Sequence, residues 1–288
     1  MFRAYFNIIK QISVRCELGV LDCLKGLLVA VAWQLYKRTI GFPVIINTFQ
    51  NTLFILRPNC NISSRFVYEG SPDQRFVTTP SKFSGENVNF VDVGANVGMY
   101  ATLLCHDFES GWVFEPNPVA FEMARQNLAI NGALDKFKMM EAVAGSHSGI
   151  VKFPLLDIPL PTARVGDESG GGMIERDMYC LDELLDHDRE YVIKIDTEGF
   201  DGEVIRGLEK VLSDRLVKIC LFECHTDKLL NSIIHFLKVD NDFDYEIMDG
   251  IRHIDSDEDF AKRNRDLFMV RKDLVSVYTE YTSRLTCE

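Results

Sequence analysis

Residues 88–100 contain the feature that most constrains the fold, an apolar run that leads directly into a glycine-rich turn. The segment reads VNFVDVGANVGMY: the run is interrupted at Asp92, and Gly94 and Gly98 enclose a turn without bulky side chains. Glycine permits positive φ and a close approach of another group. A helix that begins after such a turn directs amide N–H groups at an anion or a carboxylate. We therefore predict a strand, turn and helix that hold a ligand.

Short apolar runs alternate with helical segments from about residue 87 onwards. Alternation of this kind is typical of right-handed βαβ units in a parallel sheet covered on both faces. The last two runs follow each other without a clear helix, which favours an antiparallel hairpin at the sheet edge. The predicted fold class is thus α/β, doubly wound and Rossmann-like, mostly parallel with an antiparallel C-terminal edge hairpin. The strands are expected at 89–93, 111–115, 137–141, 190–196, 217–223, 244–250 and 266–272, and the helices at 97–106, 117–131, 180–187, 201–213 and 226–238.

The first eighty residues have a different pattern and are assigned to an N-terminal extension. We expect one or two helices over 4–38, a hairpin over 44–57 and a polar, turn-rich segment over 59–76 that wraps the following domain. The apolar run 26–33 is shorter than the roughly 20 residues that a membrane-spanning helix needs. A core-facing helix is expected there, with peripheral membrane contact as the alternative. The domains predicted are residues 1–80, 81–275 and a tail over 276–288.

The net charge, the cysteine spacing and the N-terminal sequence narrow the expected partners and location of the protein. The chain has 31 Lys and Arg against 43 Asp and Glu, and its formal net charge of −12 disfavours nucleic acid as a partner. Eight cysteines lack a framework spacing, and Cys220 and Cys224 would share one face of a strand rather than surround zinc. Charged residues interrupt the apolar N-terminus, so no signal peptide is expected and the predicted location is cytoplasmic. The oligomeric state stays open.

Two classes of adenosine-containing cofactor suit the glycine turn. Dinucleotides favour GxGxxG, whereas the spacing here is GxxxG with Asn96 in place of the second glycine. The ammonium of S-adenosylmethionine can reach carboxylates and carbonyls at such a turn. Glu115, 23 residues after Asp92, can accept hydrogen bonds from both ribose hydroxyls in either class, or can complement a helix N-terminus. The turn favours S-adenosylmethionine, while Glu115 leaves both cofactors open.

Six blocks of sequence together resemble the FkbM family of S-adenosylmethionine-dependent methyltransferases over roughly residues 60–270. DVGANVG, FEPNP and KIDTEG in combination are far more specific than any one of them. The resemblance implies a class I methyltransferase sheet and methyl transfer to a hydroxyl of a glycan, glycolipid or secondary metabolite. The blocks are FVDVGANVGMYATLL, FEPNPVAFEMARQNLAING, EAVAGSHSGIVKF, CLDELL, VIKIDTEGFDGEVIRG and ICLFECH.

The resemblance also implies a cofactor site at the ends of the first three strands of the alternating region. One group of residues would surround the methionine part of the cofactor, a second would hold the ribose and a third would lie near the adenine. These groups are, in that order, Asp92, Gly94, Ala95, Asn96 and Gly98; Glu115 with Pro116 and Asn117 behind it; and Glu141 with Ala142.

Acidic side chains and a histidine at the ends of two later strands are the candidates for chemistry. KIDTEG would place Asp196 beside the transferred methyl group, with Glu198 on the following turn, and LFECH would place Glu223 and His225 near the same rim. Methyl transfer needs an aligned oxygen and removal of its proton, which we assign to Asp196, Glu198 and His225. His225 can instead begin the helix 226–238.

Several alternatives remain. No metal is expected, but a divalent ion on Asp196 and Glu223 is conceivable because hard oxygen ligands suit it. Lys194 either pairs with a nearby acid or contacts the substrate, and residues 157–173 form either a lid or a plain loop. An NAD(P)-binding oxidoreductase lacks its glycine spacing here. A non-catalytic module of the same fold should have lost its strand-end acids, which this chain retains.

Overall fold

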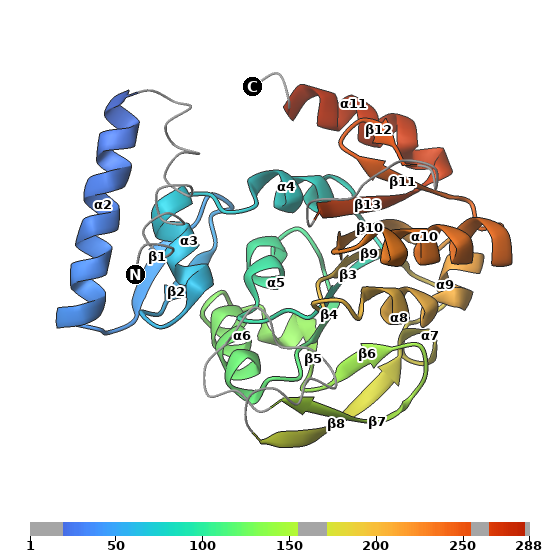
Figure 1. Ribbon diagram of the computed structural model, residues 1–288, viewed down its shortest axis with the longest axis horizontal. Coiled ribbons are helices and arrows are strands. Elements are labelled where there is room, and N and C mark those ends of the chain that lie inside the picture. Colours follow the sequence, from blue (N-terminus) through green and yellow to red (C-terminus); the bar gives the residue numbers. More distant parts are fainter. Residues whose placement is uncertain (1–19, 155–171, 255–264, 286–288) are drawn as a thin grey trace. The chain divides into compact units, whose positions relative to one another are not determined.

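The computed structural model describes residues 20–154, 172–254 and 265–285 (Figure 1). The chain divides into two compact units, residues 1–74 and 75–288. Of the predicted N-terminal helices, the part before residue 20 lies outside the described residues, and so does most of the predicted loop or lid at 157–173.

The first unit contains a helix, a hairpin and a second helix. Its elements are α2 (Val20–Thr39), β1 (Val44–Asn47), β2 (Leu53–Leu56) and α3 (Asn61–Glu69). The hairpin was predicted, whereas α3 falls in the polar segment that was expected to be rich in turns, where no helix was predicted. Phe66 of α3 packs on Phe54 of β2 with ring centroids 4.6 Å apart, and Trp33 Nε1 of α2 donates to Ser64 Oγ at 3.1 Å. Tertiary packing therefore stabilises a helix whose Asn and Ser residues suggest a loop.

The second unit is built on an eight-stranded sheet, and it confirms the predicted fold class. The strand order is β12-β11-β13-β10-β9-β3-β4-β5. The five strands from β10 to β5 in this order run parallel, while β13 pairs antiparallel with both β10 and β11. The strands are β3 (Val88–Val93), β4 (Gly111–Phe114), β5 (Phe137–Met140), β9 (Glu190–Ile195), β10 (Val217–Cys224), β11 (Tyr245–Asp249), β12 (Arg252–His253) and β13 (Arg265–Arg271).

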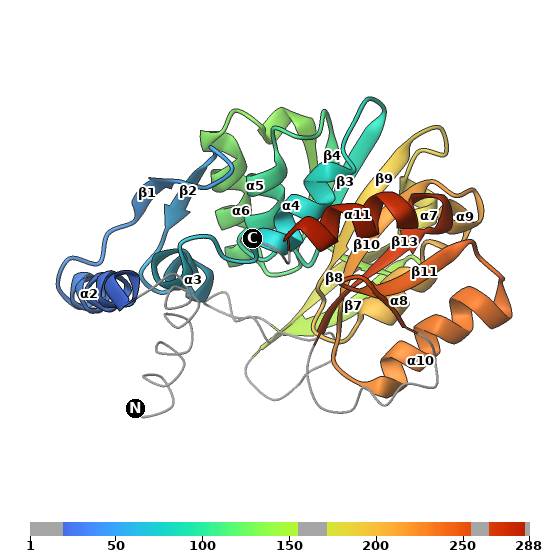
Figure 2. The same cartoon turned by 90° about the horizontal axis from the view of Figure 1, so that it is seen from above.

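Helices cover both faces of this sheet (Figures 1 and 2). One face carries α5 (Met99–Leu104) and α6 (Pro118–Ile130), and the other carries α8 (Asp201–Arg206) and α10 (Asp227–His235). The predicted helix 201–213 is divided into α8 and α9 (Glu209–Ser213) around Gly207, where a Cβ atom would lie 2.1 Å from the Gly145 carbonyl oxygen. All six residues of β3 are buried, as expected for a central strand covered twice.

Two further helices pack against the antiparallel part of the sheet. They are α4 (Gln74–Lys82) and α11 (Val275–Leu285), the second of which lies in the predicted C-terminal tail. Phe268 of β13 lies 5.9 Å from Phe76 and 5.4 Å from Tyr278, between ring centroids. The Tyr281 hydroxyl donates to the Thr78 carbonyl at 3.2 Å, so the last helix is tied to the first one of this unit.

A separate three-stranded sheet was not predicted. It consists of β6 (Val143–Gly145), β7 (Gly149–Pro154) and β8 (Met173–Cys180), in the order β6-β8-β7. Gly145 and Gly149 with the polar residues between them indicate a turn, and the charged run Glu175–Asp177 hides the alternation of β8. The short elements that complete the second unit are α7 (Leu181–Leu184), η1 (Leu134–Lys136), η2 (Phe236–Asp240) and η3 (Lys272–Leu274).

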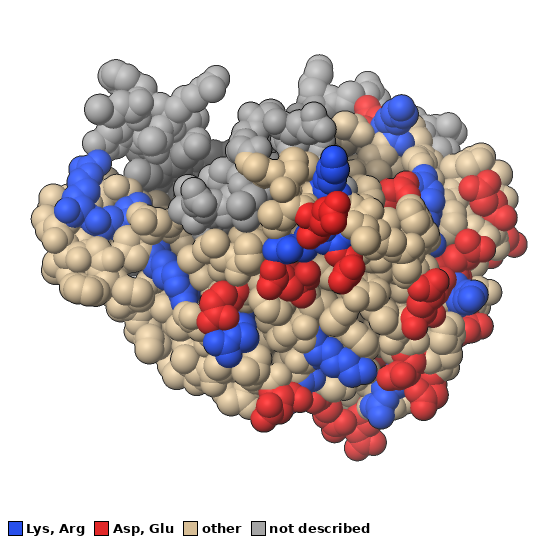
Figure 3. Space-filling model, turned by 90° about the horizontal axis from the view of Figure 1, so that it is seen from below, with Lys and Arg blue, Asp and Glu red and all other residues tan. Residues whose placement is uncertain are grey.

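The structure also shows the state of the two neighbouring cysteines and the distribution of surface charge. Cys220 and Cys224 are free and buried in β10. Acidic and basic side chains are interspersed over the face drawn in Figure 3. Within the described ranges, the helices are all too short or too polar to cross a bilayer.

Candidate active site

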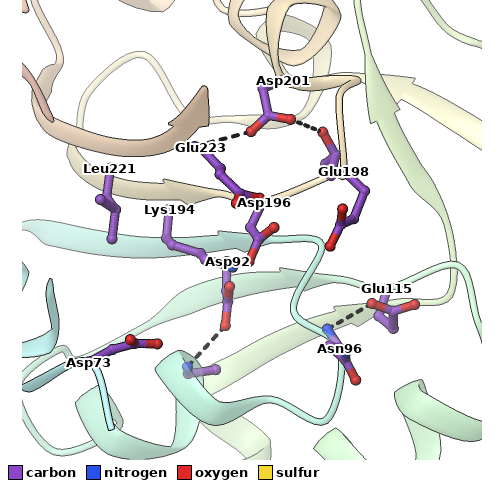
Figure 4. Close-up of polar contacts among 12 residues, drawn as sticks. Asp73, Asp92, Asn96, Glu115, Lys194, Asp196, Glu198, Asp201, Leu221 and Glu223 are labelled. Atoms are coloured by element: carbon purple, nitrogen blue, oxygen red, sulfur yellow. Dashed lines mark hydrogen bonds and ion pairs between the residues drawn. The ribbon is translucent and has the colours of Figure 1, made fainter. Parts of the chain in front are cut away.

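The candidate site lies at the carboxyl ends of β3 and β9, where the order of the strands reverses. From β3 the chain proceeds outwards through β4 and β5, and it then returns to place β9 on the other side of β3. Ligands of doubly wound sheets bind at such a switch point. The glycine turn after β3 and the segment Asp196–Gly199 after β9 therefore meet at one rim (Figure 4).

The two glycines of the turn are required by the protein itself. Gly94 has a φ of 72°, and a Cβ atom there would lie 1.9 Å from the Asp196 carbonyl oxygen. Gly98 has a φ of 73°, and its Cβ atom would lie 2.8 Å from that of Ala124 in α6. The sequence interpretation attributed both residues to the approach of a ligand. The structure shows that the close neighbours are the loop after β9 and the helix α6.

Asp92 lies beneath the turn and is fully buried, with 0% of its surface exposed. Its Oδ2 accepts a hydrogen bond from the Ala101 amide at 3.0 Å, which anchors α5 (Figure 4). Burial raises the pKa of Asp92 to about 6, against the opposing effect of Lys194. Its Oδ1 has no hydrogen-bond partner among the described residues. The side chain thus supports the turn from below and retains one unused acceptor.

Glu115 connects the ends of β4 and β3. Its Oε2 accepts from the Asn96 amide at 2.7 Å, and its Oε1 accepts from the Asn117 amide at 2.8 Å. The residue is 6% exposed, and burial raises its pKa to about 7 although both amide hydrogen bonds oppose the shift. Because a carboxylate oxygen can accept more than one hydrogen bond, both atoms retain capacity for hydroxyl groups.

The neighbouring predicted residues have structural partners as well. Asn117 caps α6, since its Oδ1 accepts from the amides of Val119 and Ala120 at 2.9 and 3.1 Å. Asn96 has a positive φ of 51°, and its buried Oδ1 has no partner within the described parts of the chain. Ala95 is buried in the turn. The acceptor atoms of Asp92 and Asn96 leave a polar site that an ammonium or hydroxyl group can satisfy.

Arg176 of β8 is a site residue that the sequence interpretation missed. Its Nε donates to the Pro116 carbonyl at 2.7 Å, and its Nη2 forms an ion pair with Glu141 at 2.6 Å. Ala142, next to Glu141, is buried. The arginine therefore joins the loops that follow β4 and β5, the two loops assigned to the ribose and the adenine. In the sequence, Arg176 is marked only by its charge, within a run in which apolar and polar residues alternate weakly.

Lys194 is buried between two carboxylates. Its Nζ lies 3.0 Å from Asp196 Oδ2 and 4.9 Å from the centroid of the Tyr100 ring. Register pairs Lys194 with Asp92 across β9 and β3. Burial acts to lower the pKa of Lys194, but Asp196 and Asp92 together raise it above its ordinary value. The ion pair that the sequence left as one of two possibilities is thus present.

Asp196, Glu198, Glu223 and His225 converge at the rim, as predicted from the strand ends. His225 Nε2 lies 3.2 Å from Glu223 Oε2 and 3.9 Å from Glu198 Oε2. Burial acts to raise the pKa of Asp196, but Lys194 and a hydrogen bond with Glu223 lower it overall. Burial and the charges of Asp196 and Glu198 raise the pKa of Glu223 to about 8. At neutral pH Asp196 is therefore ionised, whereas Glu223 mostly carries a proton.

The backbone of the loop after β9 is held by Asp201, a second residue that was missed. Its Oδ2 accepts from Thr197 Oγ1 at 2.8 Å and from the Gly199 amide at 3.2 Å, and its Oδ1 accepts from the Glu223 amide at 3.3 Å. Glu198 and Gly199 both have positive φ, 55° and 106°. Asp201 thus fixes an unusual turn that presents Glu198 beside β10 (Figure 4).

A possible metal site differs from the pair considered in the sequence. The ligand atoms of Glu198, Glu223 and His225 all lie within 4.8 Å of one another. Asp196, which was paired with Glu223 as the alternative, is not part of this group; it forms an ion pair with Lys194 and a hydrogen bond with Glu223.

Two curated relatives of this chain are methyltransferases by name. Methyltransferase sdnD of Sordaria araneosa is 27% identical, and the match covers 43% of this chain and 61% of sdnD, so the chain spans less than two thirds of that relative. Hexuronic acid methyltransferase AglP of Haloferax volcanii is 26% identical over 59% of this chain and 67% of AglP. The solved structure of M. jannaschii TYW2 in complex with AdoMet is 14% identical, with a TM-score of 0.43 over 79% of this chain and 84% of that one; so weak a likeness adds nothing to the assignment.

A family model decides the classification. The model described as "Methyltransferase FkbM domain" matches residues 92–247, which is more than half of the 288 residues. The matched stretch begins at Asp92 and contains the glycine turn, Glu115, the loop after β9 and the end of β10. The chain therefore belongs to the FkbM methyltransferase domain family.

Proposed function

We propose that this chain transfers the methyl group of S-adenosylmethionine to a hydroxyl oxygen of a glycan, glycolipid or secondary metabolite. Family membership supports methyl transfer and S-adenosylmethionine as the methyl donor. The relative named as a hexuronic acid methyltransferase supports an acceptor with sugar hydroxyls. The observation that carries the proposal is the convergence of Asp196, Glu198 and His225 at the rim where the glycine turn also ends.

The residues around the turn fit this cofactor. Asp92 Oδ1 and Asn96 Oδ1, which have no hydrogen bond within the described ranges, can accept from an ammonium, and the carboxylate of Glu115 can accept from ribose hydroxyls. Glu141 and Ala142 would border the adenine, with Arg176 holding Glu141 in place. When bound, S-adenosylmethionine supplies a methyl group on a sulfonium, and its transfer leaves the electron pair of the broken S–C bond on sulfur.

The rim residues provide alignment and a proton acceptor for the incoming hydroxyl. Fixing the oxygen in line with the methyl carbon can contribute about 7–11 kcal/mol to the lowering of the barrier. Asp196 is held ionised by Lys194, so it accepts a hydrogen bond from the hydroxyl and takes its proton. Glu198 and His225 lie near one another at the same rim and help to orient the hydroxyl.

Calorimetric titration tests the cofactor part of the proposal. S-adenosylmethionine and NAD are titrated separately into the wild-type protein, Glu115→Gln and the control Glu109→Gln, which alters an exposed carboxylate. Hydrogen bonds to a charged group contribute about 1.5–3 kcal/mol. We therefore expect S-adenosylmethionine to bind the wild type and the control, and Glu115→Gln to bind it at least about tenfold more weakly. Binding of NAD, or of neither ligand, overturns the proposal.

Label transfer tests the acceptor part. The protein is incubated with methyl-labelled S-adenosylmethionine and glycans that contain hexuronic acid, and the methylated position is located by NMR. Asp196→Asn should lower kcat by roughly 10²–10⁴ while S-adenosylmethionine still binds. Methylation at nitrogen or carbon, rather than oxygen, contradicts the proposed acceptor chemistry.

A further inference from the structure

Three side chains at the rim present one ligand atom each to a common point. They are Glu198 on the turn after β9, Glu223 in β10 and His225 directly after β10, and we call them the carboxylate–histidine cluster. His225 Nε2 lies 3.2 Å from Glu223 Oε2 and 3.9 Å from Glu198 Oε2, and all three atoms lie within 4.8 Å of one another. Asp201 accepts from the amides of Gly199 and Glu223, and it thus ties the turn after β9 to the end of β10, which together carry one nitrogen and two oxygens.

The histidine nitrogen of this cluster lacks a hydrogen bond. His225 Nε2 is buried, and no described residue is its hydrogen-bond partner, although a carboxylate oxygen is only 3.2 Å away. The imidazole side chain is 12% exposed. A buried polar atom without a hydrogen bond destabilises the folded protein. A ligand that binds His225 Nε2 would remove this cost, at the point where the two carboxylates also converge.

The separations suit an ion better than they suit a hydrogen-bonded triad. Ligand atoms about 2.0–2.2 Å from a metal lie roughly 3 Å apart at right angles and about 3.5 Å apart in a tetrahedron. The distances of 3.2 and 3.9 Å need only small side-chain adjustments to reach these values. One imidazole with two carboxylates favours a first-row transition metal over Mg²⁺ or Ca²⁺, which prefer oxygen ligands alone.

We propose that Glu198, Glu223 and His225 bind a divalent transition-metal ion such as Mn²⁺. Three protein ligands leave coordination positions open, as in catalytic metal sites. The ion-binding site itself stands on the cluster alone, whereas its role in catalysis rests on the proposed function. In that role the ion binds the acceptor oxygen and lowers the pKa of its hydroxyl. The hydroxyl proton passes to Asp196, the oxygen forms a bond to the methyl carbon, and the S–C bond breaks with its electron pair left on sulfur.

Titration with Mn²⁺ in the absence of S-adenosylmethionine tests the site. Free Mn²⁺ is followed by its electron paramagnetic resonance signal while the full chain is added, for the wild type, Glu198→Gln and His225→Gln. His187→Gln is the matched control, because His187 pairs with Asp214 away from the cluster. We expect one Mn²⁺ per chain in the wild type and the control, and at least about tenfold weaker binding in both cluster variants.

The outcomes separate this inference from the proposed function. Urea unfolding of the same samples shows whether each variant is folded, and calorimetry with S-adenosylmethionine tests the proposed function separately. Absence of Mn²⁺ binding by the wild type, or equal binding by folded cluster variants, overturns the metal site whether or not methyl transfer occurs. Mn²⁺ binding that the cluster variants lose supports it, even if S-adenosylmethionine does not bind and the proposed function fails.

Discussion

At the scale of single residues, the site is organised by buried carboxylates whose partners are backbone amides. Glu115 holds the amides of Asn96 and Asn117, and Asp92 holds that of Ala101. These hydrogen bonds lie within the protein and fix the path of the glycine turn. A turn fixed in this way lowers the entropic cost of binding a cofactor.

Glu115 should make the protein less stable as the pH rises. Its pKa is about 7 in the folded state against an ordinary 4.5, so the folded state binds the proton more tightly. The resulting contribution to the free energy of unfolding is complete below pH 4.5 and is lost as the pH rises through 7, by roughly 3 kcal/mol in total. Urea unfolding of the wild type and Glu115→Gln from pH 4.5 to 8 measures this: the decline should be smaller in the variant. Parallel pH profiles would contradict the expectation.

Gly94→Ala should destabilise the protein far more than Gly132→Ala. Both glycines have positive φ, 72° and 61°, but a Cβ atom at Gly132 meets nothing within 4 Å. Gly132→Ala should therefore cost only the conformational penalty of about 1–2 kcal/mol. At Gly94 the Cβ atom would clash with the Asp196 carbonyl, and we expect a cost of more than about 3 kcal/mol. Chemical denaturation compares the free energy of unfolding of the two variants. Equal losses would show that the loop after β9 can move away from the added Cβ atom at little cost.

At the scale of elements, sequence patterns located strands that are buried on both faces and missed elements whose apolar pattern is interrupted. The runs at 89–93 and 217–223 were predicted because most of their residues are apolar, with Val, Ile and Phe prominent among them. β8 carries Glu175, Arg176 and Asp177 in succession, and α3 begins with Asn and Ser residues, so neither shows the pattern of its structure. Their formation depends on partners that are distant in sequence.

The three-stranded sheet, which was not predicted, contributes Arg176 to the candidate cofactor site. Arg176→Gln removes the ion pair with Glu141 and weakens the contact with the Pro116 carbonyl. Because the pair is partly exposed, the stability should change by less than about 1 kcal/mol, while the affinity for S-adenosylmethionine should fall about threefold to tenfold. Calorimetry measures both variants, with Arg125→Gln as the control, since Arg125 pairs with Glu122 on the surface of α6. An unchanged affinity would remove Arg176 from the site.

At the scale of the whole molecule, the family and the fold class were predicted from the blocks of sequence and are confirmed, and family membership also bears out the predicted cofactor. Their positions after the strands of the predicted sheet place Asp196, Glu198 and His225 at one rim, where the structure also has them. The sequence could not indicate that Glu115 binds two amides or that His225 Nε2 has no hydrogen bond with the described residues, because such facts depend on side-chain directions. The catalytic and cofactor roles of these residues stay predictions.

Residues 75–288 should fold and bind S-adenosylmethionine without the first unit. This unit contains the eight-stranded sheet and every residue assigned to the cofactor and to catalysis. We expect a single cooperative unfolding transition and a dissociation constant for S-adenosylmethionine within about threefold of that of the full chain. Calorimetric titration and urea unfolding of the shortened chain measure both. A shortened chain that does not fold would show that residues 1–74 complete its core.

The contact between Gly94 and the Asp196 carbonyl has a consequence for anyone who wishes to change the substrate. A loop grafted after β9 from another enzyme brings its own backbone path, and a shift of a few tenths of an ångström towards β3 meets the turn at Gly94. The two loops therefore form one module for protein engineering. A successful exchange of acceptor specificity would transplant the turn after β3 together with the loop after β9.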